Sequence, residues 1–158
     1  MKQESGNSDK LKTKFWTELT DSPLLFLQLD GSPDSAVPMR AHLDKDADSA
    51  IWFYVASDSH LARTGPATAT FASKDHDIFA RFHGILARET SPERRKKHWG
   101  NHVEAWFPKG LNSDGVTMLR LDLGSAEIWD HNLGILTAAR MALGMDVRDK
   151  AKHTETAL

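Results

Sequence analysis

The chain has 158 residues, of which 40% are hydrophobic and 27% are charged, and its formal net charge at pH 7 is −2. This size and composition fit one ordinary domain, and a balanced charge supplies no basic field for nucleic acid, so no nucleic-acid partner is expected. The absence of cysteine excludes disulfides and thiolate chemistry. Because the first residues lack the apolar segment of a secretion signal, a cytoplasmic protein with no membrane partner is expected.

A polar segment and a short helix are expected at the start of the chain. Residues 1–9 are polar, contain Gly and Ser, and are predicted to be disordered. Residues 10–20 carry Leu11, Phe15 and Leu19 at helical spacing. We therefore expect a short amphipathic helix that caps a sheet.

Short apolar runs separated by turn residues follow, and each has the length of a strand. The runs are residues 23–30, 36–44, 51–56, 67–73, 78–88, 116–123 and 125–130. Between two of them, Ser57 to Thr64 has the pattern of a capped single helical turn. Gly84, inside the longest of the first five runs, predicts a bulge or a barrel corner.

Helical segments are predicted in the second half of the chain. Ser91 followed by Pro92 is typical of a helix start, and Gly100 interrupts the segment, which ends before Phe107-Pro108. A further helix is predicted over 133–145. The number of short strands favours a mainly β, α+β domain over 10–146, followed by a polar tail, 147–158, rather than a parallel α/β fold.

Several motifs occur in the order typical of one known family. They are Phe15-Trp16, Pro38-Met39, Ile51-Trp52-Phe53, Asp58-Ser59, Gly84 and the series W…WFPKG…AEIWD between Trp99 and Asp130. In these motifs the chain resembles the pyridoxamine 5'-phosphate oxidase-like FMN-binding split barrels, in particular the general stress protein branch. The resemblance implies a six-stranded antiparallel Greek-key split β-barrel with peripheral helices. It also implies a homodimer with a flavin, FMN or FAD, in each of two clefts at the dimer interface.

The resemblance also assigns candidate flavin contacts. A flavin ring needs a flat, largely apolar slot, which two neighbouring strands of the family provide. The corresponding residues here are Pro38, Met39, Arg40, Ala41, Phe53, Tyr54 and Val55. Trp129 stands where oxidase members have a flavin-contacting tryptophan, so it is expected to close the slot from either subunit, with Trp106 as a second candidate.

The phosphate site departs from the family motif. Val37 stands in place of an arginine, and His60-Leu61 covers the position of a lysine. Each lost charge-assisted contact typically costs ~1.5–3 kcal/mol, so whether FMN binds stays open. The remaining local donors are Ser57, Ser59, His60 and Arg63, and Arg40 if the strand register allows.

No catalytic set and no metal site are predicted from the residues. His98 and His102 are four residues apart, but Gly100 lies between them and no third ligand is evident. Oxidase activity on pyridoxamine phosphate is not expected, because the Arg-Leu-His type tail is absent. The predicted function is a flavin-binding general stress protein with a possible flavin-dependent redox role.

Three alternatives remain open. A haem-binding split barrel would need a proximal histidine such as His60 or His153. A ligand-free dimer would fit the missing phosphate cations. A flavin or deazaflavin-dependent reductase would use the same barrel.

Overall fold

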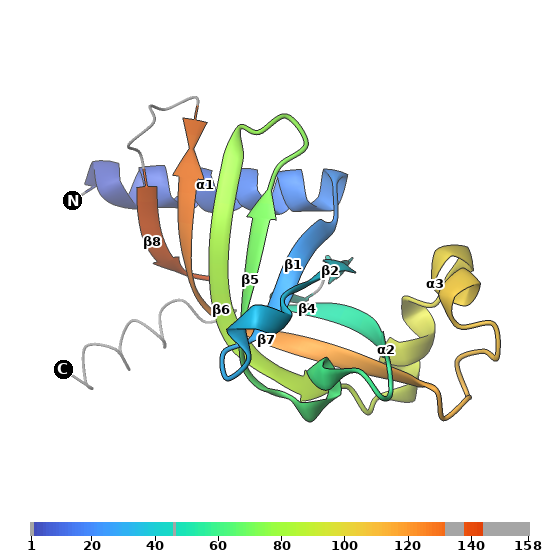
Figure 1. Cartoon of the computed structure of the whole chain (residues 1–158). Helices are drawn as coiled ribbons and strands as arrows, with labels where there is room; N and C mark the ends of the chain where they lie inside the picture. Colours follow the sequence, from blue (N-terminus) through green and yellow to red (C-terminus); the bar gives the residue numbers. More distant parts are fainter. Residues whose placement is uncertain (1, 46, 132–137, 144–158) are drawn as a thin grey trace.

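The computed structural model describes residues 2–45, 47–131 and 138–143. One curled antiparallel sheet forms its centre, with the long helix α1 behind it and the short helices α2 and α3 beside one end (Figure 1). This is the expected mainly β, α+β split-barrel-like fold. The described residues contain eight strands where six were expected.

The strands are β1 (Leu24–Leu29), β2 (Val37–Arg40), β3 (His42–Asp44), β4 (Ala47–Ala56), β5 (Gly65–Ala72), β6 (Ile78–Arg88), β7 (Val116–Asp130) and β8 (Ala138–Ala142). The helices are α1 (Lys2–Asp21), α2 (Pro92–Lys97) and α3 (Asn101–Trp106), with the 3-10 turns η1 (Pro33–Ser35) and η2 (His60–Arg63). The strand order is β2-β1-β5-β6-β7-β4-β3, and β8 pairs with β7. Among the described helices, none is long and apolar enough to span a membrane.

Strand β4 has apolar side chains on both faces because each face meets a different core. Its residues Ile51 and Phe53 belong to the main core inside the sheet. The alternating residues Trp52 and Tyr54 belong to a second cluster beneath α3. A strand covered on both sides reads as a continuous apolar run, which explains the sequence IWFYVA.

Helix α1 packs on the inner face of the sheet through the residues that the sequence pattern indicated. Leu11, Phe15 and Leu19 are fully buried, and the Phe15 ring lies 5.3 Å from that of Phe82. The helix begins at Lys2 rather than at Lys10. The apolar residues at helical spacing therefore predicted the part of the helix that packs against the core, but not the residue at which the helix begins.

Gly84 is a bulge position, as predicted. The pairing of β6 with β7 changes register between Phe82 and Gly84. A Cβ atom on Gly84 would overlap the carbonyl oxygen of Asp122 on β7. Glycine therefore allows the two backbones to approach at the point where the sheet curls.

The predicted helix over 133–145 was wrong where it can be checked. Residues 138–142 form β8, in register with Ser125 to Trp129 of β7, and residues 132–137 lie outside the described residues. The free edge of β7 offers backbone hydrogen-bond partners along the whole segment, and this pairing overrides a helical periodicity. Residues 116–123 and 125–130, predicted as two strands, form the single strand β7 that continues through Gly124.

The predicted helix starts are confirmed. Ser59 caps η2 by accepting a hydrogen bond from the Leu61 N–H at 3.2 Å. Ser91 caps α2 in the same way, with Pro92 in the first turn. Gly100 separates α2 from α3. These local signals needed no tertiary information because a cap satisfies backbone groups within its own turn.

Candidate functional site

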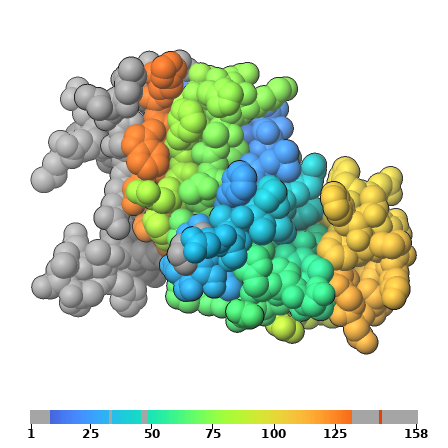
Figure 2. Space-filling view, in the orientation of Figure 1, coloured from blue at the N-terminus to red at the C-terminus, as the bar shows by residue number. Residues whose placement is uncertain are grey.

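A cavity of about 650 Å³ opens between β2, the end of β4, η2 and α3. Small-molecule sites typically measure about 300–1,000 Å³. Figure 2 shows the yellow segment that contains α3 lying beside the cyan and green surface of β2, β4 and η2. The lining residues are Leu24, Val37, Pro38, Met39, Arg40, His42, Tyr54, Val55, Ala56, Ser59, His60, Leu61, His102, Val103, Trp106 and Phe107.

The polar residues of the lining fall into two groups along the chain. At the serine-turn end, formed by Ser59 and His60, the His60 Nε2 atom lies 3.0 Å from the carbonyl oxygen of Ser35, just before β2. From there the extended chain runs from Val37 to His42, a path of about 16 Å at ~3.3 Å per residue. The second group, which we call the histidine end, consists of Arg40, His42 and His102.

The charge of the lining is one-sided. It contains one arginine and three histidines and no aspartate or glutamate. The rest of the lining is apolar apart from Ser59 and the phenol of Tyr54. Such a surface suits a ligand with a flat apolar body and a negatively charged group.

His42 is held in a mostly buried, basic environment. Its ring lies 5.1 Å from the Tyr54 ring and 5.9 Å from the His98 ring. Burial is the main cause that lowers the pKa of His42 to about 4, and Coulombic effects of His98, Arg40 and His102 act in the same direction. His42 is therefore neutral at physiological pH and can donate or accept a hydrogen bond at the cavity wall.

His98 lies behind His42 and stacks on Trp52, with 5.6 Å between ring centroids. Its Nε2 atom is buried and has no hydrogen-bond partner among the described residues. Burial is the main cause that lowers the pKa of His98, and Lys97 and Arg94 act in the same direction against Asp44. Two neutral imidazoles thus lie side by side at this end of the cavity.

The wall formed by α3 belongs to an excursion of the chain between β6 and β7, residues 89–115, which we call the α2–α3 arm. Its residues Trp99, Phe107 and Leu111 pack against the second core cluster. The hydroxyl of Tyr54 donates a hydrogen bond of 2.5 Å to the carbonyl of Arg95 on α2. The ring of Tyr54 therefore lines the cavity while its hydroxyl holds the arm.

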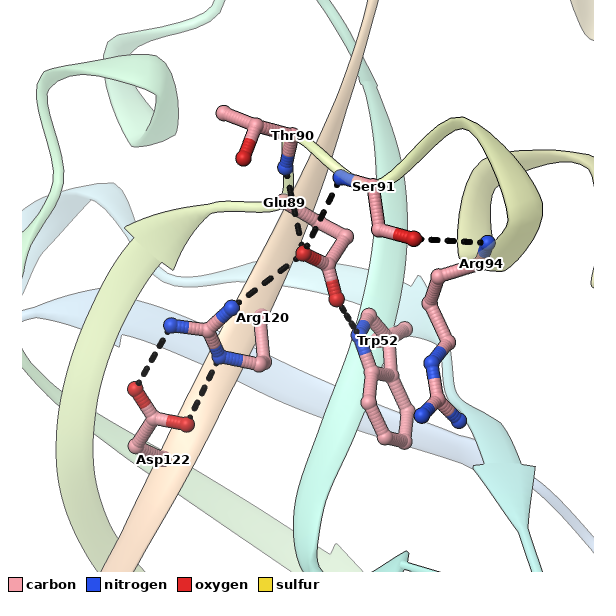
Figure 3. Close-up of polar contacts among 7 residues, drawn as sticks. All are labelled: Trp52, Glu89, Thr90, Ser91, Arg94, Arg120 and Asp122. Atoms are coloured by element: carbon pink, nitrogen blue, oxygen red, sulfur yellow. Dashed lines mark hydrogen bonds and ion pairs between the residues drawn. The ribbon is translucent and has the colours of Figure 1, made fainter.

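The start of the arm is fastened through Glu89 (Figure 3). Its carboxylate accepts hydrogen bonds from Trp52 Nε1 at 3.0 Å and from the N–H of Thr90 at 3.1 Å and of Ser91 at 3.5 Å. Arg120 donates to the same carboxylate at 3.2 Å. Burial alone would raise the pKa of Glu89, but these contacts outweigh it and lower that pKa. A charged carboxylate thus ties the arm to β4 and β7.

Eight of the thirteen residues predicted for the flavin site line this cavity. They are Pro38, Met39, Arg40, Tyr54, Val55, Ser59, His60 and Trp106. Trp106 is 81% exposed although it lines the cavity, so most of its indole is open to solvent.

The other five predicted residues lie outside the lining. Ala41 and Phe53 are buried in the main core. The hydroxyl of Ser57 bonds that of Thr117 at 2.8 Å, and Arg63 is exposed on η2. Trp129 lies at the far end of β7 from the cavity, where the Arg81 guanidinium carbon is 5.6 Å from its ring.

Sequence reasoning missed two polar residues of the lining, His42 and His102. His42 follows Pro38 and Arg40 at a spacing of two residues, which is the period of one strand face. His102 and Trp106 are four residues apart and share one face of α3.

In the described part of the chain, no three His, Cys, Asp or Glu residues form a group that could hold a metal ion.

The sequence matches a known protein family over most of its length. The family model for pyridoxamine 5'-phosphate oxidase-like proteins matches residues 10–152. A search of curated proteins finds no match.

Several solved structures are similar along almost their whole length. A protein described as general stress protein 26 from Jannaschia sp. CCS1 is 25% identical, with a TM-score of 0.74 over 85% of this chain and 98% of its own. A general stress family protein from Xanthomonas campestris pv. campestris is 33% identical, with a TM-score of 0.71 over 86% and 97%. The general stress FMN/FAD binding protein of Xanthomonas citri is also 33% identical, with a TM-score of 0.71 over 86% and 99%. The chain belongs to the pyridoxamine 5'-phosphate oxidase-like family, in its general stress protein branch.

Proposed function

We propose that the protein binds FMN in the cavity between β2, β4, η2 and α3. The observation that carries this proposal is the lining itself, which joins an apolar slot to basic groups without any carboxylate. The similar protein from Xanthomonas citri is described as FMN/FAD binding, which supports a flavin as the ligand. When bound, the flavin would supply hydride or electron transfer, and the protein would bind and orient it.

The apolar slot fits the flat ring of a flavin. Pro38 and Met39 on β2 and Tyr54 and Val55 on β4 would contact the ring. Trp106, largely exposed at the cavity wall, would cover it and lose solvent contact on binding.

The serine-turn end would hold the phosphate. Ser59 and His60 line the cavity there, whereas Arg63 lies outside the lining. Because Val37 and Leu61 are apolar at two lining positions, the phosphate would have fewer charge-assisted contacts than the family motif provides. Losing two such contacts places the expected FMN affinity in the micromolar range.

We also propose a homodimer formed across the outer face of the sheet. Phe26 pairs with Thr70 and Thr70 with Arg81, and directly opposite residues share a face. Arg81 and Trp129 are in contact on this face. Patches of exposed apolar side chains of this kind mark protein interfaces. The exposed large apolar residues of these strands are Leu24, Phe26, Phe79 and Ile85.

Leu24 links the outer face to the cavity, because it lines the cavity and is 58% exposed. A second copy on this face would lie next to the cavity mouth. Trp129 of one subunit could then close the cavity of its partner, in line with the role that the resemblance assigns to it.

The first experiment is an absorbance and fluorescence scan of the purified protein before and after dialysis against FMN, with its mass measured by light scattering. A dimer that takes up one FMN per chain with quenched flavin fluorescence is expected. A colourless protein that does not bind FMN would refute the proposal. A Soret band in the absorbance spectrum would indicate that the bound cofactor is haem and not a flavin. Phe26→Glu and Phe79→Glu should yield monomers, and variants that keep the mass of a dimer would show that the outer face is not the interface.

The proposed phosphate contacts are tested by comparing the binding of FMN with that of riboflavin. Ser59→Ala and His60→Gln should each weaken FMN by about ten-fold and leave riboflavin, which lacks the phosphate, unchanged. Arg63→Gln, on the same turn but outside the lining, is the matched control and should affect neither ligand. Equal losses for FMN and riboflavin would remove the phosphate from this end.

A further inference from the structure

The serine-turn end of the cavity offers one ionisable side chain, His60, among the described residues that line it. Val37 and Leu61, which also line the cavity, are apolar, and Arg63 on the same turn lies outside the lining. A phosphate held at this end would therefore meet a positive charge from the turn only when His60 is protonated. The state of the two ring nitrogens decides what His60 can do.

One ring nitrogen of His60 is already used within the protein. Its Nε2 atom lies 3.0 Å from the carbonyl oxygen of Ser35, which belongs to η1. A carbonyl oxygen only accepts hydrogen bonds, so Nε2 must carry a proton in this contact. A neutral imidazole has a single N–H, and Nδ1 is then an acceptor. Among the described residues, none donates a hydrogen bond to Nδ1.

The second nitrogen, Nδ1, can bind a phosphate only with an additional proton. A fully ionised phosphate oxygen is an acceptor, and so is Nδ1 of the neutral ring, so the two repel each other. The missing proton can come from an imidazolium ring or from a singly charged phosphate, and both routes give the same complex. Imidazole in model peptides titrates near pH 6.5 and a phosphate monoester near pH 6. Above about pH 7, the proton must therefore be taken up from solution.

The hydroxyl of Ser59 can donate to a phosphate at any pH. Its oxygen accepts a hydrogen bond from the Leu61 N–H at 3.2 Å in the cap of η2. This contact leaves the hydroxyl proton available to a ligand. Ser59 would therefore make a contact that does not depend on pH, and the pH dependence would come from His60.

The charged residues of the elements around His60 are aspartates and arginines, which in model peptides do not titrate between pH 6 and 9. They are Asp34 on η1, Arg40 on β2, Arg88 on β6, Asp58 before η2 and Arg63 on η2. Arg88 donates a hydrogen bond to the carbonyl of Ala62 on η2 at 3.4 Å. The other histidines of the lining are His42 and His102. A change of FMN affinity in this interval thus has to come from a histidine or from the phosphate.

We propose that FMN binding takes up one proton, which Nδ1 of His60 shares with the phosphate, so that the affinity for FMN falls as the pH rises above neutrality. This inference rests on the proposed FMN site, and it adds the regulation of that site. Permanently charged donors would give the opposite sign, because the phosphate becomes a dianion above about pH 6. Riboflavin lacks the phosphate, so its affinity should not change with pH in this range.

The test is a fluorescence-quenching titration of the full chain with FMN and with riboflavin at pH 6.5, 7.5 and 8.5. The ratio of FMN affinity to riboflavin affinity should fall about ten-fold across this range. Calorimetric titrations at pH 7.5 in two buffers of different ionisation enthalpy should show uptake of most of a proton with FMN and none with riboflavin. A ratio that stays constant or rises with pH, or FMN binding without proton uptake, would overturn the inference.

Variants of the turn identify the group that holds the proton. His60→Gln should remove the pH dependence and bind FMN weakly throughout. His60→Lys supplies a permanently charged donor and should bind FMN at least as tightly at pH 8.5 as at pH 6.5. Riboflavin affinity should be unchanged in both variants, which verifies that the cavity keeps its shape. Arg63→Gln, on the same turn but outside the lining, should keep the pH dependence.

The remaining outcomes separate this inference from the proposed function. Loss of the pH dependence in His42→Gln or His102→Gln, but not in His60→Gln, would overturn the inference by assigning the proton to another histidine. FMN binding with a constant ratio to riboflavin would overturn the inference alone and leave the flavin site supported. No binding of either flavin at any pH would overturn the flavin site and this inference with it.

Discussion

The guanidinium group of Arg94 on α2 lies over the ring of Trp52 on β4, with its carbon 4.6 Å from the ring centroid (Figure 3). Cation–π contacts of this kind contribute about 0.5–2 kcal/mol, depending on solvent access. The contact joins the α2–α3 arm to the strand that forms the back of the cavity. The stability of the arm and the shape of the cavity are therefore coupled.

Trp52→Phe should destabilise the protein by ~2 kcal/mol or more, measured by urea unfolding. The substitution removes the N–H that donates to Glu89 at 3.0 Å and leaves a partly buried carboxylate with one donor fewer. Trp106→Phe makes the same chemical change at a side chain that is 81% exposed and should alter stability by less than about 0.5 kcal/mol. Equal effects at the two sites would contradict the role of the Glu89 contact.

Gly84→Ala should cost ~1–3 kcal/mol in unfolding free energy, because the added methyl would overlap the carbonyl oxygen of Asp122. Gly31→Ala is the matched control, since a Cβ atom there meets nothing within 4 Å. Thermal melts of both variants check the prediction. A neutral Gly84→Ala would mean that β6 and β7 can separate at the bulge without loss.

The stability of the protein should fall as the pH is lowered from 6.5 to about 4, in part because of His42. Its pKa is lower in the folded protein, so the unfolded chain binds more protons in this interval and gains relative stability. His42→Gln should reduce the slope of unfolding free energy against pH by up to ~1.4 kcal/mol per pH unit. Identical slopes for the parent and the variant, measured by urea unfolding at several pH values, would rule out a buried neutral imidazole.

Lys14→Met should destabilise the packing of α1 on the sheet by ~1–3 kcal/mol. The Lys14 ammonium lies 3.3 Å from both oxygens of Asp130, a carboxylate that is 3% exposed at the end of β7. Lys12→Met, two residues away on the same helix, is the control for a change of charge alone. Hydrogen exchange of α1 amides reports the effect, and equal protection in both variants would contradict the contribution of this ion pair.

The local features of the fold could be predicted from the sequence because each depends on a few neighbouring residues. The caps at Ser59 and Ser91 and the bulge at Gly84 follow from backbone hydrogen bonding and steric limits within one turn or strand pair. The family motifs likewise indicated β2 and the end of β4 as walls of a cavity. That prediction concerns strands whose alternating faces are set by the backbone.

Other features were decided only by tertiary contacts. Residues 138–142 form a strand because the edge of β7 is available to them, which no local periodicity reveals. Phe53 and Ala41 face the core rather than the cavity because the curl of the sheet determines which face of each strand points inward.

The histidine end of the cavity also depends on tertiary contacts and could not be predicted from the sequence. From the sequence alone, His42 and His102 are ordinary histidines sixty residues apart. The α2–α3 arm brings His102 to the cavity, and it does so through Trp52, Tyr54 and Glu89, whose partners are distant in the chain. Local sequence determined the caps, the bulge and the strand faces because these depend on the backbone nearby, whereas only the packing of the arm on β4 decided which polar side chains share the cavity.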